Sequence, residues 1–281
     1  MSTHERLATW RADIEAALRS LLPDPLSEPR RLHAAMRYAL MSPGKRIRPL
    51  LVAVCAEHLG CEPARALLPA CALELVHAAS LVLDDLPCMD DALERRGQPS
   101  VHARYGEDVA MLASVALLNE AYALVARAPG LSEACRCDLV RLLADTVGPQ
   151  GLTGGQELDL RRGFSPSIGE IGDMHRRKTG VLFVAAVETA RLLAGAGEEA
   201  RAPLRLFAEE LGLAFQALDD IADQDEAATH AGNVISVLGH EAAKRRAARR
   251  LQNAKAALGE AGLGAVSGYL DLVLGPALAT G

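Results

Sequence analysis

Aromatic residues are scarce in this sequence of 281 residues. Only 3% of the residues are Phe, Trp or Tyr, and Trp10 is the single tryptophan. Proteins that bind single-stranded nucleic acid commonly stack bases on aromatic side chains, and their binding domains are usually basic. This chain carries a formal net charge of −6. We therefore expect no nucleic-acid partner.

The sequence also lacks paired cysteine motifs and targeting signals. Its six cysteines (Cys55, Cys61, Cys71, Cys88, Cys135 and Cys137) contain no C-x-x-C pair, so free thiols in a reducing compartment are expected. The first residues, Met1 to Arg6, are polar and lack the apolar region of a signal peptide. No uncharged apolar run approaches the roughly 18 residues of a membrane-spanning helix. These absences predict a cytoplasmic protein without a membrane span.

Helical periodicity dominates what remains. Half of the residues are hydrophobic, and they recur at the three- and four-residue spacing of amphipathic helices. The pattern predicts one all-α domain over residues 1–281, a single large helical bundle around a central cavity. Glycines interrupt the pattern at 148–155, and 224–238 reads as irregular. Helices are expected at about 7–21, 32–40, 46–59, 62–84, 107–127, 133–147, 167–193, 211–223, 240–258 and 263–274.

One cluster of carboxylates follows the apolar helical run that ends at Leu83. It contains Asp84, Asp85 and Asp90, and the end of a helix is unfavourable for anions unless a cation lies among them. Asp84 and Asp90 are six positions apart, which is about 240° around a helix, and Pro87 favours the break that lets them converge. Oxygen ligands favour Mg²⁺ over zinc. A solvated acidic loop paired with Arg95 and Arg96 is the alternative.

A second cluster follows another apolar helical run. Asp219, Asp220 and Asp223 lie together there, and Asp219 and Asp223 share a helix face. The two clusters are far apart in sequence and can face each other only across a folded core. Two carboxylate poles that hold metal around one cavity suit a ligand with a diphosphate group.

Cationic residues accompany these clusters. Lys45 and Arg48 lie at the start of a predicted helix, where anions are favoured. His77 precedes Asp84 by seven residues and shares its helix face, and Lys178 belongs to a basic interruption of a long apolar helix. These residues predict a phosphate site. Each has a simpler interpretation, respectively a solvated turn, a structural histidine and a charged helix face.

Several separated motifs together resemble the trans-polyprenyl diphosphate synthases, and most closely the bacterial geranylgeranyl diphosphate synthases. The resemblance runs from about residue 32 to 238. Its motifs, in family order, are Gly44–Pro49, His77–Asp91 with Arg95-Arg96-Gly97, Gly155–Leu160, Lys178–Gly180 and Phe215–Asp220.

The resemblance implies an all-α fold with aspartate clusters on opposite walls of a cavity, and commonly a homodimer. It implies a prenyltransferase that condenses isopentenyl diphosphate with an allylic diphosphate, here expected to be farnesyl diphosphate, using three Mg²⁺ ions. The metal ligands would be Asp84, Asp85, Asp90, Asp219, Asp220 and Asp223. The allylic substrate would contact Arg95, Lys178 and Gln216, and isopentenyl diphosphate would contact Lys45, Arg48, His77 and Arg96. The catalytic dipoles would come from Lys178, Thr179 and Gln216.

Two further features bear on the product and on activity. In the family, bulk one or two turns before the first aspartate limits chain length, and the small Ala79 and Ser80 predict a C20 product. Asn233 stands where relatives usually carry a lysine near the allylic diphosphate. An amide brings no positive charge, so this position predicts either a weakened synthase or one for which the remaining cations suffice.

Three alternatives stay open from the sequence. A farnesyl diphosphate synthase differs only in product length. A terpene cyclase would need a second metal motif, for which Asn233 and Glu241 have the outer spacing but Val237 occupies the middle position. A partner subunit without activity would not need the intact aspartate clusters.

Overall fold

Helices form almost all of the regular structure in the described ranges of this computed structural model, residues 2–160, 167–222 and 234–272. Residues 267–272 are also helical. The all-α prediction is confirmed. The principal helices are α1 (Thr3–Leu21), α2 (Arg30–Met41), α3 (Ile47–His58), α4 (Pro63–Asp84), α6 (Glu107–Arg127), α7 (Glu133–Val147), α9 (Ile168–His175), α10 (Val181–Ala194), α11 (Arg201–Ala222) and α14 (His240–Glu260).

Short elements complete the fold, and several of them were missed. A two-stranded hairpin is formed by β1 (Glu94–Arg95) and β2 (Gln98–Pro99), and these strands are too short to show alternation. The glycine-rich region interrupts the helices at residues 148–151, but residues 152–155 already belong to α8. Residues 234–238, expected to be irregular, are helical. The short helices are α5 (Val101–Tyr105), α8 (Leu152–Leu160), η1 (Arg176–Gly180), η2 (Glu198–Ala200), α13 (Val234–Leu238) and η3 (Gly264–Val266).

Capping boxes fix the start of two helices. The Ser167 hydroxyl accepts from the backbone amide of Glu170 over 3.2 Å, and the Glu170 carboxylate accepts from the Ser167 amide over 2.8 Å. Ser2 and Glu5 make the same reciprocal pair before α1. Each pair satisfies backbone donors that a helix start leaves without an intrahelical partner. The long helix predicted from Ser167 exists, but η1 divides it into α9 and α10.

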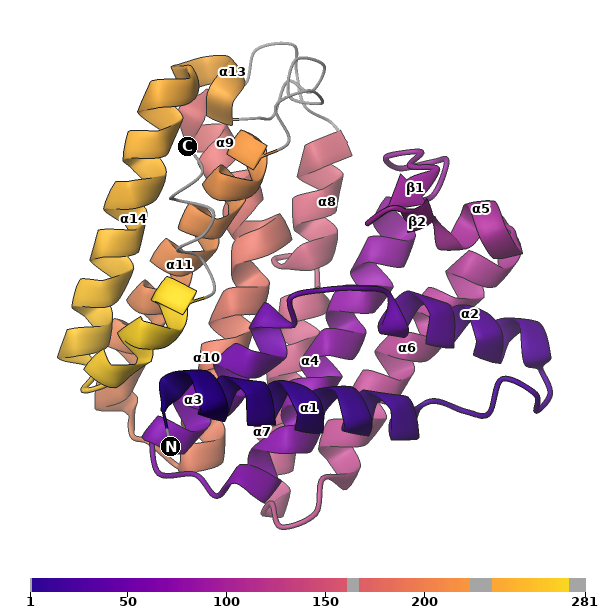
Figure 1. Cartoon of the computed structure of the whole chain (residues 1–281), viewed down its shortest axis with the longest axis horizontal. Coiled ribbons are helices and arrows are strands. Elements are labelled where there is room, and N and C mark those ends of the chain that lie inside the picture. The colour runs from indigo at the N-terminus through magenta and orange to yellow at the C-terminus, as the bar shows by residue number, and fades with distance from the viewer. Residues whose placement is uncertain (1, 161–166, 223–233, 273–281) are drawn as a thin grey trace.

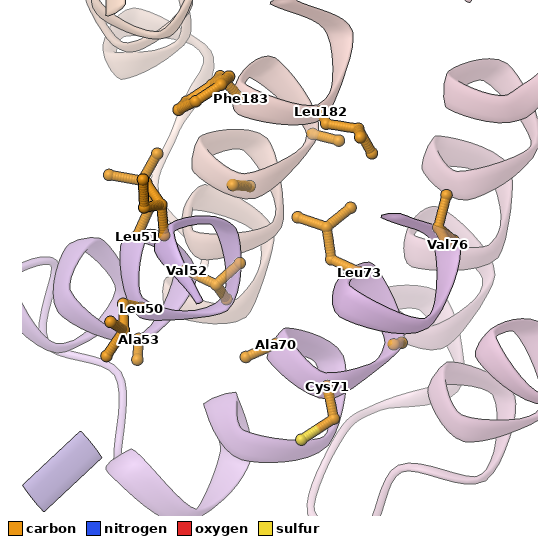
Figure 2. Packing of buried hydrophobic residues seen from close by; sticks show 14 of the residues in the cluster. Leu50, Leu51, Val52, Ala53, Ala70, Cys71, Leu73, Val76, Leu182 and Phe183 are labelled. Carbon is orange, nitrogen blue, oxygen red and sulfur yellow. The ribbon is translucent and has the colours of Figure 1, made fainter. Parts of the chain in front are cut away.

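The core lies where α3, α4 and α10 meet. Figure 2 shows side chains from these three helices packed together, including Val52 of α3, Leu73 of α4 and Phe183 of α10. All three are fully buried. Burial of such a side chain contributes about 1.5–3 kcal/mol, so these helices form a rigid frame for whatever their ends carry.

Around this core α4 packs against α6 as well as α3 and α10, while α11 packs against α14. Helix α1 runs across the direction of α4, α6 and α10 rather than along it (Figure 1). Its Trp10 is buried and donates to the carboxylate of Glu57 on α3 over 2.9 Å. The N-terminal helix is therefore fastened to the frame.

Two helices, α4 and α6, are long and apolar enough to cross a membrane by length and composition. In α4 the apolar window is 67% buried inside the fold, and in α6 it is 44% buried. The core position of α4 accounts for its composition, and the absence of a membrane span stays a prediction. All six cysteines lie in the described residues and none forms a disulfide, as expected.

Candidate active site

One cavity of about 840 Å³ opens between the start of α3, the end of α4, the hairpin, η1 and α11. Segments far apart in the sequence meet at its wall. Most of the residues singled out from the sequence line it, namely Lys45, Arg48, His77, Ser80, Asp84, Asp90, Arg95, Arg96, Lys178, Thr179, Gln216, Asp219 and Asp220.

The first carboxylate pole forms where α4 ends at Asp84. The loop that follows folds back on the helix end, and the backbone amide of Asp90 donates to the carbonyl of Asp84 over 2.9 Å. Both residues therefore reach the cavity wall, as the break expected near Pro87 predicted. Burial raises the pKa of Asp84 to about 6, and Asp90 adds to this rise while Lys178 opposes it.

Asp85 differs in placement from the prediction. It is only 2% exposed and is absent from the cavity wall. Its Oδ1 accepts from Nε of Arg95 over 2.6 Å and lies 2.5 Å from Nη2. A buried carboxylate needs a cationic partner, and Arg95 satisfies that need. In this structure Asp85 therefore orients Arg95, and the metal-ligand role expected from the sequence stays a prediction.

The second pole lies on α11. Asp219 and Asp220 both line the cavity. Asp220 accepts from Nε2 of Gln216 over 2.9 Å and from the backbone amide of Val234 over 3.0 Å. It therefore links α11 to α13 and fixes which way the Gln216 amide is turned. Two residues of interest lie outside the described part of the chain: Asp223 and Asn233.

The donors of the two poles fit a divalent cation. Their oxygen atoms suit Mg²⁺, which is usually bound through one or two carboxylates plus water and substrate phosphates. The raised pKa of Asp84 marks a carboxylate whose charge the protein alone stabilises poorly. Within the described ranges no three His, Cys, Asp or Glu side chains already form a metal-binding group. The arrangement is therefore two walls that each offer part of a ligand set.

The hairpin contributes Arg96 to a basic wall. Arg95 pairs with Gln98, so Arg96 and Gly97 are the two turn residues. Their φ angles of 55° and 73° are both positive, as a type I′ turn requires. An arginine in this left-handed region is unfavourable by about 1–2 kcal/mol. Nη1 of Arg96 donates to the carbonyl of Pro43 over 2.8 Å, which ties the hairpin to the loop before α3.

Arg48 is a half-buried cation of this wall. Its Nη1 lies 3.2 Å from Nε2 of His77, and its guanidinium lies 5.1 Å from the ring centre of Phe183 and 5.9 Å from that of Phe215. Burial lowers the pKa of Arg48 to about 10, although Glu74 opposes this. Burial and the Arg48 charge hold the pKa of His77 well below its ordinary value. His77 is therefore neutral at pH 7, and its Nε2 can accept from Arg48.

Lys178 lies in η1, a π-helical turn between α9 and α10. Such turns interrupt α-helices mainly at functional sites. Its Nζ lies 2.7 Å from Oδ2 of Asp159 on α8 and 3.8 Å from Oδ2 of Asp90. Burial alone would lower the pKa of Lys178, but Asp84 and Asp159 raise it. Lys178 therefore stays charged beside the first carboxylate pole.

Two contacts hold η1 in place. The Thr179 hydroxyl donates to Oε1 of Gln216 over 2.7 Å. On the other side Gly155 of α8 lies so close that a Cβ there would be 2.7 Å from the carbonyl carbon of Arg177 and 2.8 Å from Cα of Lys178. Only glycine allows this approach. The glycine in the predicted motif thus sets the position of Lys178.

The two predicted chain-length residues have different surroundings. Ser80 lines the cavity, and its hydroxyl donates to the carbonyl of His77 over 2.9 Å. Ala79 is fully buried and does not line the cavity, and its carbonyl accepts from the Ser114 hydroxyl of α6 over 3.0 Å. Of the two, Ser80 is the one in contact with the cavity in this structure.

Sequence reasoning missed several residues that support the site. Glu74, Phe215 and the largely buried Arg46 line the cavity, and Asp159 pairs with Lys178. Asp159 and Arg46 lie inside motifs that were recognised in the sequence, and this position could have identified them as site residues. Nothing in an apolar helix distinguishes Glu74 in advance, since its role depends on which helices pack around it.

Comparisons with known proteins agree with this geometry. Residues 29–236 match the family model described as Polyprenyl synthetase. The chain is 44% identical to the geranylgeranyl diphosphate synthase of Pantoea ananas, over 86% of this chain and 83% of that protein. It is 37% identical to the farnesyl diphosphate synthase of Geobacillus stearothermophilus, over 84% of this chain and 80% of that protein.

A solved structure has the same fold. The geranyltransferase of Legionella pneumophila superimposes with a TM-score of 0.89 at 28% sequence identity, covering 99% of this chain and 98% of that one. The matched region includes both aspartate clusters, the basic segment before α3 and the Lys178 motif. The chain therefore belongs to the polyprenyl synthetase family.

Proposed function

We propose that this prenyltransferase condenses isopentenyl diphosphate with farnesyl diphosphate, and so produces geranylgeranyl diphosphate and pyrophosphate. The observation that carries the proposal is one cavity whose wall holds two groups of charged side chains, each suited to bind an anion. One region combines the carboxylate poles with Lys178, and the other combines Arg48 with Arg96. Two regions suit two diphosphates, whereas a terpene cyclase binds only one.

The allylic diphosphate would lie between the aspartate poles. Arg95 and Lys178 are the cations beside this position, and Asp85 and Asp159 hold them by ion pairs. We propose that three Mg²⁺ ions are held by Asp84, Asp90, Asp219, Asp220 and Asp223. When bound, these ions neutralise the diphosphate and stabilise the charge that develops as it leaves.

Isopentenyl diphosphate would lie against the basic wall of Lys45, Arg48, His77 and Arg96. Arg48 supports this assignment because burial lowers its pKa, so a bound anion would stabilise its charge. Neutral His77 can accept from Arg48 through Nε2 and then offers its protonated Nδ1 to another acceptor.

The chemistry that follows is an electrophilic condensation. The allylic C–O bond breaks and the diphosphate takes the electron pair. The double bond of isopentenyl diphosphate attacks the allylic carbon, and loss of one proton restores a double bond, with the departed diphosphate as the acceptor. Leu81, Leu182 and Phe215 give part of the cavity wall an apolar surface that does not react with the cation.

Fixed dipoles near η1 would stabilise the cation. The Thr179 hydroxyl directs its proton to Gln216, which leaves the oxygen lone pairs of Thr179 available. Asp220 holds the other end of the Gln216 amide. The carbonyl of Lys178 lies in the π-helical turn. Oxygen dipoles set in position before the reaction stabilise developing positive charge without reorganisation.

We propose a C20 product because small side chains precede the first carboxylate pole. Ser80 lines the cavity one turn before Asp84, and Ala79 lies beside it. A C15 product is the principal alternative, because the chain is also similar to a farnesyl diphosphate synthase.

We further propose a cytoplasmic homodimer. Helix α6 supports the dimer because its apolar face is exposed, with Met111, Leu112 and Val115 at 48%, 58% and 63% exposure. A contiguous apolar face of this kind is typical of a protein interface. Sedimentation of the purified protein would test whether it is a dimer.

The test of function is an incubation of the purified protein with Mg²⁺, isopentenyl diphosphate and farnesyl diphosphate. We expect pyrophosphate and a C20 alcohol after phosphatase treatment, identified by mass. A hydrocarbon would indicate a cyclase, and a C15 alcohol from shorter primers alone would indicate a farnesyl synthase. No product from folded protein with either farnesyl diphosphate or the shorter primers would indicate a partner subunit.

A further inference from the structure

The N-terminal helix α1 touches the basic loop before α3 at two points. Arg11 of α1 donates through Nη2 to the carbonyl of Lys45 over 3.0 Å. Glu15, one turn later, accepts from Nε of Arg46 over 2.8 Å. Helix α1 lies outside the residues that match the family model, which begin at residue 29.

We propose that α1 is a positioning element for the isopentenyl diphosphate site, and that Arg11 and Glu15 are its positioning residues. This inference rests on the proposed function of Lys45 and Arg48. Neither Arg11 nor Glu15 is part of the cavity wall, so they act through the loop.

Arg46 connects α1 to the loop before α3. Although it stands between the two proposed substrate cations, it is only 5% exposed. Its three guanidinium nitrogens already have partners, namely Glu15, Glu74 at 2.8 Å and the carbonyls of Leu40 and Ser42 at 2.9 and 3.2 Å. These four hydrogen bonds take up four of the five guanidinium N–H groups, so Arg46 mainly holds the loop in place.

The backbone of Arg46 shows why the loop needs such support. Its φ of 51° lies in the left-handed region, which a side chain makes unfavourable. Strained residues persist only where surrounding contacts fix them. Because this residue separates Lys45 from Arg48, its relaxation would turn the two proposed phosphate contacts away from each other. The bond from Arg11 to Lys45 holds the loop on the other side of the same bend.

Electrostatic attraction between Arg46 and two glutamates strengthens the connection between α1 and the loop before α3. Arg46 keeps its proton because Glu74 and Glu15 offset the effect of burial on its pKa. Glu74 also faces Arg48 and Arg96 of the basic wall. Without Glu15, Glu74 is the one carboxylate left to pair with Arg46. The Glu74 carboxylate is then drawn toward Arg46 and away from Arg48 and Arg96. Glu15 therefore supports both the shape of the loop and the charge distribution around it.

The experiment compares two pairs of variants in steady-state kinetics with each substrate varied in turn. The first pair is Glu15→Gln and its control Glu57→Gln. Glu57 also anchors α1, through Arg6 and Trp10, but it does not contact the loop. The second pair is Arg11→Ala and its control Arg19→Ala, an exposed arginine near the end of the same helix. Melting temperatures are recorded for all four.

We expect Glu15→Gln to raise KM for isopentenyl diphosphate by about tenfold, as loss of one charged hydrogen bond suggests. Arg11→Ala should raise it by about threefold. KM for farnesyl diphosphate and kcat should change by less than about twofold, since the chemistry occurs at the other pole. Glu57→Gln should lower the melting temperature while leaving both KM values unchanged.

Two outcomes would overturn the inference. One is a KM for isopentenyl diphosphate that rises equally in Glu15→Gln and Glu57→Gln at similar melting temperatures, which would show only general loosening. The other is an unchanged KM in Arg11→Ala, whose exposed side chain lets the variant fold. An Arg48→Ala variant separates the proposals. If Arg48→Ala raises KM for isopentenyl diphosphate while the α1 variants do not, the substrate site is supported and the role of α1 is refuted. If Arg48→Ala leaves this KM unchanged, the assignment of the substrate site itself is refuted.

Discussion

The contact between α8 and η1 allows a sharp test of how Lys178 is positioned. In a Gly155→Ala variant the new methyl group would lie 2.7 Å from the carbonyl carbon of Arg177 and closer still to the Lys178 nitrogen. Ordinary contact begins near 3.4 Å. These neighbours are backbone atoms, so the π-helical turn must move by about 1 Å relative to α8.

The magnitude follows from that displacement. A misplacement of about 1 Å at a catalytic group can reduce the rate by about 100-fold, equivalent to about 2.7 kcal/mol. Overpacking should lower stability by about 1–3 kcal/mol. We therefore expect a folded variant with a melting temperature a few degrees lower and kcat/KM for the allylic substrate about 100-fold lower.

The control is Gly259→Ala in α14, where a Cβ meets nothing within 4 Å. It should leave kcat/KM unchanged and raise stability slightly, because alanine favours a helix over glycine. Gly212→Ala tests the opposite side of the turn, since its Cβ would lie 2.8 Å from Cα of Gly180. If Gly155→Ala folds with kcat/KM within about threefold of wild type, packing by α8 does not position Lys178.

Other predictions concern the poles and the product. Asp84→Asn or Asp219→Asn should lower turnover by about 10³-fold or more with an unchanged helical circular dichroism spectrum, because transition-state charge loses its support; near-normal turnover would refute the metal assignment. The raised pKa of Asp84, about 6 against 3.8, means that its ionised form destabilises the metal-free protein. Asp84→Asn should therefore raise the melting temperature above about pH 6, and this gain should shrink below that pH and vanish below about pH 4. Ser80→Phe or Ala79→Tyr should shift the product toward C15 by mass analysis, and an unchanged product would place the cavity floor on another helix. Asn233→Lys should raise kcat/KM for the allylic substrate at low salt, and a folded variant that is no faster would show that position 233 does not face the diphosphate.

The sequence predicted the features that depend on local pattern. Asp84 and Asp90 share the cavity wall because the helix ends where it was expected to end, before Pro87. The capping box at Ser167 was recognisable because both partners lie within one turn. The all-α fold and the family were predictable for the same reason, since helical spacing and motif order are written in the chain itself.

Other features depended on tertiary contacts and were not predictable. The π-helical turn at Lys178 changes the hydrophobic spacing too little to interrupt a periodic pattern. Asp84 and Asp85 are adjacent and chemically identical, yet one lines the cavity and the other is paired with Arg95. Only the hairpin, whose strands are too short for a sequence signal, decides between them.

Each side of the cavity carries a charge that burial destabilises, negative on one side and positive on the other. Burial disfavours the charge of Asp84 on one side and of Arg48 on the other, as their shifted pKa values show. In the proposed function a different ligand would relieve each effect, since a metal ion would stabilise the carboxylate and a diphosphate would stabilise the guanidinium. Lys178 offsets only part of the negative charge on the acidic side, because it also pairs with Asp159. A site that holds such charges in place before its ligands arrive loses some stability, but it needs little reorganisation when the allylic bond breaks.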